Sequence, residues 1–111
     1  MSVTLSPTNF GITTDHIGSA TTLRFHGALE VRHAAAARVA VREFLDNAEP
    51  ALHAVVDLSA VDELDTAGLA AVTSPVLNAS RAGRTVSVVA PMAATPRRLA
   101  DQVGVLPIGP R

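Results

Sequence analysis

The chain contains no cysteine and no lysine, and its only aromatic residues are three phenylalanines. Without cysteine it has no disulfide framework, no thiolate nucleophile and no cysteine-based zinc site. Without lysine it lacks the P-loop lysine, the Schiff-base lysine and the lysine general base of several enzyme classes. Because tyrosine and tryptophan are also absent, the chain offers no aromatic platform on which bases or sugars could stack.

The chain also has no excess of positive charge and no long apolar run. The net charge is −1, so no broad positive surface exists to bind nucleic acid. No apolar run approaches the roughly 18 residues of a membrane span. The N-terminal segment MSVTLSPTNFGITTDH lacks the basic start and the apolar core of a signal peptide. We therefore expect a soluble, cytoplasmic protein whose partners are neither nucleic acids nor membranes.

The composition that remains is typical of one folded domain. Hydrophobic residues make up 48% of the chain and charged residues 17%, which is too apolar for a disordered tail. A chain of 111 residues is long enough to bury one core. The sequence therefore predicts a single domain over residues 1–111.

The first half of the chain predicts a hairpin, a helix and a buried strand. Alternating apolar and polar residues predict strands over residues 10–16 and 21–27. Residues 31–45 are rich in helix formers and predict a helix that ends before Pro50. The apolar side expected for this helix is formed by Val31, Ala35, Val39 and Leu45. The apolar run over residues 52–59 is typical of a central strand that is buried on both faces.

The second half predicts two helices with a strand between them. Helical periodicity starts at Thr66 and continues to a stop signal at Gly83. Pro75 lies inside this helix, where it removes a backbone N–H donor. Residues 84–90 predict a strand.

The C-terminal segment completes the expected fold. TPRRLADQVG predicts a helix with Thr95 as its cap and Pro96 at its first position, and the residues VLPI at 105–108 allow a short last strand. The element order β-β-α-β-α-β-α predicts an α/β sandwich with a mixed central sheet and helices mainly on one side.

Thr66 lies where the acidic segment VDELD meets an apolar one, and two roles fit this position. As a helix cap, its hydroxyl would accept a hydrogen bond from the first turn, which stabilises a helix by about 1 kcal/mol. As a phosphorylation site, it would carry about two negative charges, which the free N–H groups at a helix start tolerate. We expect Gly68 to keep the first turn slim, so that another protein can approach the hydroxyl.

The segment AVVDLSAVDELDTAGLAAV resembles the signature of the STAS domain, the fold of anti-sigma factor antagonists. In that signature a hydrophobic strand ends in Asp-Leu-Ser and is followed by Asp-Ser/Thr-Ser/Ala-Gly-Leu. LRFHGALEV resembles the family's strand that ends in Gly-Glu-Leu-Asp. RAGRTVSVVAPMAATPRRLADQVGV resembles its Gly-x-x-Val-x-Val strand, variable loop and final helix. These landmarks extend the similarity over nearly the whole chain.

The resemblance implies a non-enzymatic protein that regulates transcription by partner switching. In that family the unmodified antagonist binds an anti-sigma factor and frees the sigma factor. The anti-sigma factor is also a serine/threonine kinase that phosphorylates the residue matching Thr66, and a PP2C-type phosphatase reverses the modification. Ala67 replaces a second hydroxyl of the motif, so a doubly modified site is not available. The residues that the resemblance assigns to partner binding are Glu30, Asp62, Glu63, Asp65, Thr66, Ala67 and Gly68.

Two alternatives stay open at this point. One is a STAS scaffold or adaptor subunit of a signalling or transport complex, in which Thr66 is only a helix cap. The other is a receiver-like domain in which Asp57, at the end of the central strand, accepts a phosphoryl group. A receiver needs a lysine near that group, which favours a structural role for Asp57 in binding nearby N–H groups.

Neither a metal nor a cofactor is predicted. The acidic residues before Thr66 are expected to form a solvated rim. The histidines lie far apart in the sequence without ligand-like spacing; they are His16, His26, His33 and His53.

Overall fold

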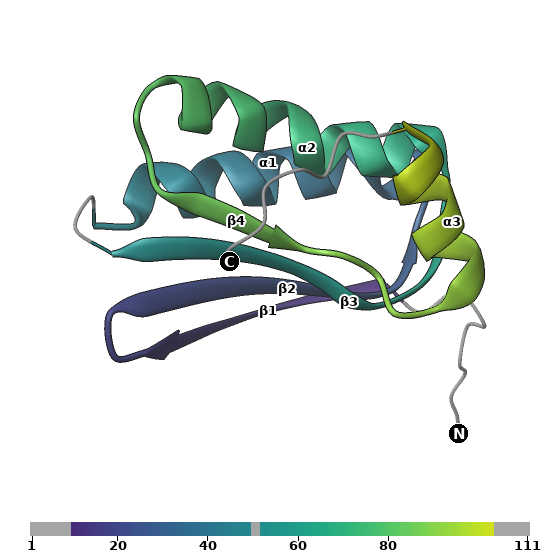
Figure 1. Ribbon diagram of the computed structural model, residues 1–111, viewed down its shortest axis with the longest axis horizontal. Coiled ribbons are helices and arrows are strands. Elements are labelled where there is room, and N and C mark those ends of the chain that lie inside the picture. The colour runs from purple at the N-terminus through teal and green to yellow at the C-terminus, as the bar shows by residue number, and fades with distance from the viewer. Residues whose placement is uncertain (1–9, 50–51, 104–111) are drawn as a thin grey trace.

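The computed structural model describes residues 10–49 and 52–103, which form one four-stranded sheet and three helices (Figure 1). The elements are β1 (Phe10–Ile17), β2 (Ala20–Leu29), α1 (Val31–Asn47), β3 (His53–Leu64), α2 (Thr66–Arg81), β4 (Val86–Val89) and α3 (Ala94–Val103). The strand order is β1-β2-β3-β4, with β1 antiparallel to β2 and the other neighbours parallel. The predicted element order and mixed sheet are confirmed, and the strand predicted over residues 105–108 lies outside the described residues.

A two-residue loop, Gly18 and Ser19, closes the predicted hairpin of β1 and β2. Ile17 pairs with Ala20 at the closed end, and Gly18 has a φ of 60°. Tight hairpin loops need positive φ angles, which glycine adopts without the clash that a Cβ causes. The hairpin leaves the second edge of β2 free to pair with β3.

α1 and α2 pack against each other over one face of the sheet, as predicted (Figure 1). The core beneath them is mainly aliphatic, and its largest buried side chains include Phe25, Leu29, Leu58 and Leu69. Burying one such side chain contributes about 1.5–3 kcal/mol to stability. Because β2 and β3 are parallel, α1 and α2 begin at the same end of the sheet, where α3 also lies (Figure 1).

The buried side of α1 differs from the predicted one. Val31 is 66% exposed, Val39 is 53% exposed and Ala35 is also exposed. Of the predicted residues only Leu45 is buried, and Ala37 and Val41 are buried with it. In a helix so rich in alanine, several faces are similarly apolar, so contacts with the sheet and with α2 decide its rotation.

β3 is longer than predicted and continues through the acidic segment to Leu64. Its pairing with β2 shifts register twice along this part. Such bulges let a strand keep Val61 buried while Asp62 and Glu63 remain exposed. The sequence had predicted Asp57 at the end of this strand. In the structure Asp57 lies within the strand instead.

In α2 the predicted position of Pro75 inside the helix is confirmed, whereas α3 begins one residue earlier than its predicted cap. Pro75 lies inside α2 and is buried, and because it has no N–H the carbonyl of Ala71 loses its partner in the next turn. α3 begins at Ala94, so Thr95 and Pro96 lie within its first turn and the prediction of Thr95 as the cap is wrong. Among the described residues, no helix is both long and apolar enough to cross a membrane.

Candidate functional site at the start of the second helix

Thr66 is the first residue of α2, and Asp65 is the residue that caps this helix. Asp65 has extended backbone angles, and its Oδ1 accepts a hydrogen bond of 2.8 Å from the backbone N–H of Gly68. A helix cap makes this bond with the third residue of the first turn. The expected capping role of Thr66 is therefore wrong, because the carboxylate one residue earlier already fills it.

The same carboxylate also binds the start of α1. Its Oδ2 accepts a hydrogen bond of 2.9 Å from the backbone N–H of Val31, the first residue of that helix. Glu30 precedes Val31 at the cap position of α1, but its side chain makes no capping bond. Asp65 thus satisfies one free N–H group in each helix and lies at the positive ends of both helix dipoles.

Gly68 allows the start of α2 to approach the end of β2. It is buried, and a Cβ at this position would lie 2.6 Å from the carbonyl carbon of Leu29 and 3.1 Å from the backbone nitrogen of Glu30. Nearby, the backbone N–H of Asp65 donates to the Leu29 carbonyl oxygen at 3.4 Å. The chain's own backbone fills the space that the glycine leaves. The expectation that Gly68 makes room for another protein is therefore wrong.

The side chain of Thr66 is exposed, and its hydroxyl makes no hydrogen bond within the part of the chain that the structure describes. Together with Leu64 and Asp65 it lines a groove of about 360 Å³. The groove is completed by residues of α3, which are Thr95, Arg98, Leu99 and Gln102. An exposed hydroxyl beside an open groove is accessible to a partner protein.

Acidic side chains lie on the segments that lead into α1 and α2. Asp62 and Glu63 are exposed near the end of β3, and Glu30 is half-buried at the end of β2. Ala67 is half-buried, whereas Gly68 lies beneath the surface. The residues predicted for partner binding are thus gathered at one end of the sheet. Across residues 10–49 and 52–103, no group of three or more His, Cys, Asp or Glu side chains is placed to hold a metal ion.

Arg98 is a residue of this groove that the sequence did not connect with Thr66. It is one of two adjacent arginines, and of these Arg98 lines the groove while Arg97 does not. The signal that distinguishes them is helical spacing, since Thr95, Arg98 and Gln102 fall on one face of α3. Only the folding of α3 against the end of β3 places that face beside Thr66.

Asp57 lies apart from this site, in the interior of β3. Its Oδ1 accepts a hydrogen bond of 2.8 Å from the backbone N–H of Ser59, and its Oδ2 accepts one of 3.0 Å from Nε of Arg24. Burial raises the pKa of Asp57, but the hydrogen bonds from Ser59 and Arg24 and the charge of Arg24 outweigh burial and hold the pKa below its usual value. The receiver-like alternative requires an aspartate at the end of a strand, and Asp57 does not meet this requirement.

A family model described as "Mlab, STAS domain" matches residues 12–105, which is most of the chain. The chain belongs to the STAS domain family. The resemblance in the sequence is thereby confirmed, and the segment with Asp65, Thr66 and Gly68 lies inside the matched region.

Solved structures of anti-sigma factor antagonists share the fold of this STAS domain. The STAS domain of an antisigma-factor antagonist from Rhodobacter sphaeroides is 27% identical, with 76% of this chain and 89% of that chain covered and a TM-score of 0.56. An anti-sigma factor antagonist from Mycobacterium paratuberculosis is 21% identical, with coverage of 96% and 90% and a TM-score of 0.72. The antagonist SpoIIAA in its unphosphorylated form is 12% identical, with coverage of 85% and 98% and a TM-score of 0.53. Curated proteins gave no significant match.

Proposed function

We propose that this STAS domain is an anti-sigma factor antagonist that binds its anti-sigma factor while Thr66 is unmodified and is released when Thr66 is phosphorylated. The observation that carries the proposal is that Asp65 caps α2 while the Thr66 hydroxyl is exposed and makes no hydrogen bond in the described residues. A hydroxyl without a role in the fold can be modified without loss of a native contact. The similarity to the antisigma-factor antagonist of Rhodobacter sphaeroides supports the same function.

A phosphate on Thr66 is compatible with the fold. The free N–H groups and the positive dipole end at the start of α2 favour an anion by about 0.3–1 kcal/mol. Arg98 lines the same groove and contributes a positive charge, while the exposed Asp62 and Glu63 contribute negative ones. Surface charges of this kind each change stability by about 1 kcal/mol or less. We therefore expect the phosphorylated domain to remain folded.

The same phosphate acts much more strongly on a docked protein. Phosphorylation adds about two negative charges to a surface that is already acidic. A partner carboxylate about 6 Å away is repelled by roughly 1.4 kcal/mol in water-like surroundings and by about 5.5 kcal/mol at an effective dielectric of about 20. These energies correspond to roughly tenfold to ten-thousandfold weaker binding. Phosphorylation therefore controls affinity while the fold stays intact.

In this proposal the domain itself catalyses nothing. The partners are an anti-sigma factor with serine/threonine kinase activity, which modifies Thr66, and a PP2C-type phosphatase, which restores the hydroxyl. The domain, the anti-sigma factor and the phosphatase together regulate transcription in the cytoplasm. The contact surface comprises Thr66 and Ala67 together with the acidic residues that flank them, and Asp65 and Gly68 hold this surface in shape.

The test is phosphorylation of the purified chain by an anti-sigma kinase encoded in the same genome, followed on a phosphate-affinity gel. We expect the wild type to be modified and Thr66→Ala to remain unmodified. Thr95→Ala is the matched control, because Thr95 lines the same groove but is not the proposed acceptor. Modification of Thr66→Ala would refute the assignment of the site.

A binding measurement tests the electrostatic part of the proposal. Calorimetry with the same anti-sigma factor should show roughly threefold to hundredfold weaker binding for Thr66→Glu, because its single negative charge gives about half of the repulsion worked out for the phosphate. Thr66→Gln has a similar size and no charge, so it should bind nearly as well as the wild type. Equal binding of the Glu and Gln variants would show that charge at this position does not control the partner.

A second candidate is a STAS scaffold or adaptor subunit without a switch. It is favoured by the structural roles of Asp65 and Gly68, since helix capping and close backbone packing account for both residues without any modification. Under this alternative, Thr66→Glu would bind the partner as tightly as the wild type does, and the kinase would not label the chain.

A further inference from the structure

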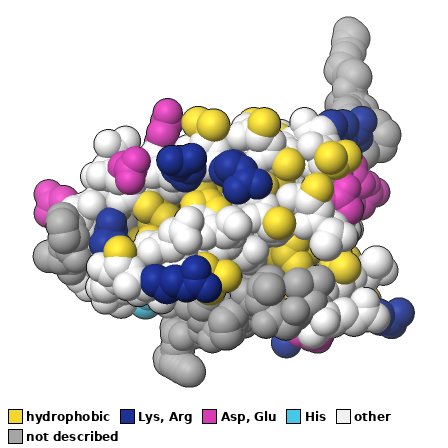
Figure 2. Space-filling view, turned by 90° about the horizontal axis from the view of Figure 1, so that it is seen from above, with side chains coloured by type: hydrophobic (Ala, Val, Ile, Leu, Met, Phe, Trp, Pro, Cys, Tyr) yellow, Lys and Arg dark blue, Asp and Glu magenta, His cyan; other side chains and the backbone are white. Residues whose placement is uncertain are grey.

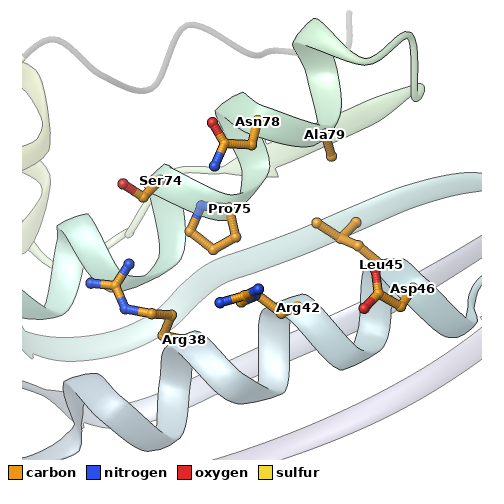
Figure 3. Close-up of a pocket in the computed structure, with 8 residues that line it drawn as sticks. All are labelled: Arg38, Arg42, Leu45, Asp46, Ser74, Pro75, Asn78 and Ala79. Carbon is orange, nitrogen blue, oxygen red and sulfur yellow. The ribbon is translucent and has the colours of Figure 1, made fainter.

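A second groove lies on the outer side of the helical layer, between α1 and α2 (Figure 3). Its volume is about 440 Å³, and it is lined by Arg38, Arg42, Leu45 and Asp46 of α1 and by Ser74, Pro75, Asn78 and Ala79 of α2. None of these residues lines the groove at Thr66. Ser74 lies two turns beyond Thr66, about 12 Å further along α2. The two grooves are therefore separate sites.

Two arginines of α1 border this groove without a partner of opposite charge. Arg38 and Arg42 are one turn apart, and their side chains extend from α1 along the groove (Figure 3). Within residues 10–49 and 52–103, neither guanidinium forms an ion pair or a hydrogen bond. Like charges at this spacing destabilise a helix. The stability of α1 therefore does not explain why both positions are arginine.

The charge on the helical face is unevenly distributed. Figure 2 looks onto this face and shows basic side chains together near its middle, beside apolar surface, with acidic side chains towards its ends. Arg38 and Arg42 line the groove on this face, whereas Asp62 and Glu63 lie near Thr66 at one end of the sheet. Two arginines and one aspartate line the groove, so its net charge favours a negatively charged ligand.

We propose that the groove between α1 and α2 binds a short acidic segment of a partner protein. Arg38 and Arg42 would bind its carboxylates, since a guanidinium pairs with a carboxylate through two parallel hydrogen bonds. Opposite them, Ser74 and Asn78 offer a hydroxyl and an amide to the backbone of the segment. Pro75 is buried under this surface, where its ring forms a rigid apolar floor.

The shape of the groove favours a peptide over a small free anion. From Arg38 to Asp46 the helix rises about 12 Å, which equals about three to four residues of extended chain. The groove lies at the surface, because its lining residues Arg38, Ser74 and Asn78 are exposed, whereas sites for small molecules enclose most of the ligand surface. Asp46 makes the far end negative, so the acidic residues of the segment must lie at the Arg38 end.

The test is an NMR titration of the full, unphosphorylated chain labelled with ¹⁵N. The probe is a capped tetraglutamate peptide, and inorganic phosphate is titrated in a separate experiment for comparison. We expect the peptide to shift the amide signals of Ser74 and Asn78 with saturation. Binding should weaken by about tenfold or more in the double variant Arg38→Gln/Arg42→Gln. None of these measurements involves Thr66, so their outcome is independent of the proposed switch.

The control is the double variant Arg81→Gln/Arg97→Gln, which removes the same charge from two exposed arginines outside both grooves. It should bind the peptide like the wild type. Equal losses in both double variants would show that only net charge matters, and unshifted signals at Ser74 and Asn78 would show that the groove is not used. Both results would overturn the proposal. Tighter, saturating binding of phosphate than of the peptide would also overturn it, because the ligand would then be a small anion.

Discussion

Replacing Asp65 by alanine should destabilise both α1 and α2, because one carboxylate caps the two helices. Oδ1 accepts from Gly68 and Oδ2 from Val31, at 2.8 Å and 2.9 Å. Removing one capping side chain costs about 0.5–2 kcal/mol, typically about 1. Two caps therefore predict a loss of about 2 kcal/mol in the free energy of unfolding.

This loss is large enough to measure by heat or urea. With an unfolding entropy of about 2.1 cal/mol/K per residue, the 111 residues give about 0.23 kcal/mol/K, so 2 kcal/mol lowers Tm by about 9 °C. Urea unfolding followed by far-UV circular dichroism gives the free energy directly. In contrast, Thr66→Ala should change stability by less than about 0.5 kcal/mol, because its side chain is exposed.

Asp62→Ala is the matched control, since it removes an exposed carboxylate from the same acidic segment. If Asp65→Ala were no less stable than Asp62→Ala, the double cap would make no contribution to stability. If Thr66→Ala lost as much stability as Asp65→Ala, the hydroxyl would share the capping role and would not be free for modification.

Three further outcomes are expected. Gly68→Ala should lower the free energy of unfolding by about 2 kcal/mol or more, because its Cβ meets buried backbone; urea unfolding identical to wild type would contradict this packing. The pKa of Asp57 is lowered in the folded state, so its stabilising contribution is complete above its ordinary pKa and is lost as the pH falls below about 4. Stability curves should thus fall less steeply there for Asp57→Asn, and parallel curves would argue against the effect. With phosphothreonine installed at Thr66, ³¹P NMR should give a lower second phosphate pKa in wild type than in Arg98→Gln, since a nearby cation favours the dianion. Arg97→Gln should match wild type, and equal values in all three proteins would place Arg98 out of reach.

The predictions that succeeded depend on short stretches of sequence. The hairpin was predictable because alternating residues and Gly18 determine it locally, and the start of α2 was placed at Thr66 by the change from acidic to apolar residues. The rotation of α1 was predicted wrongly, because Ala35 and Ala37 differ only in their contacts with other elements. The extent of β3 was missed, since exposed charges such as Asp62 do not mark a bulged strand.

The sequence by itself determined the order of elements, the family motif and the presence of a hydroxyl at Thr66 beside acidic residues. Only the tertiary structure decided what each motif residue does. Asp65 reaches an N–H group 34 positions earlier in the chain, and α3 brings Arg98 into the groove of Thr66. Local patterns reflect neighbours along one element, whereas these contacts exist only after parallel strands carry two helix starts and a third helix to one end of the sheet.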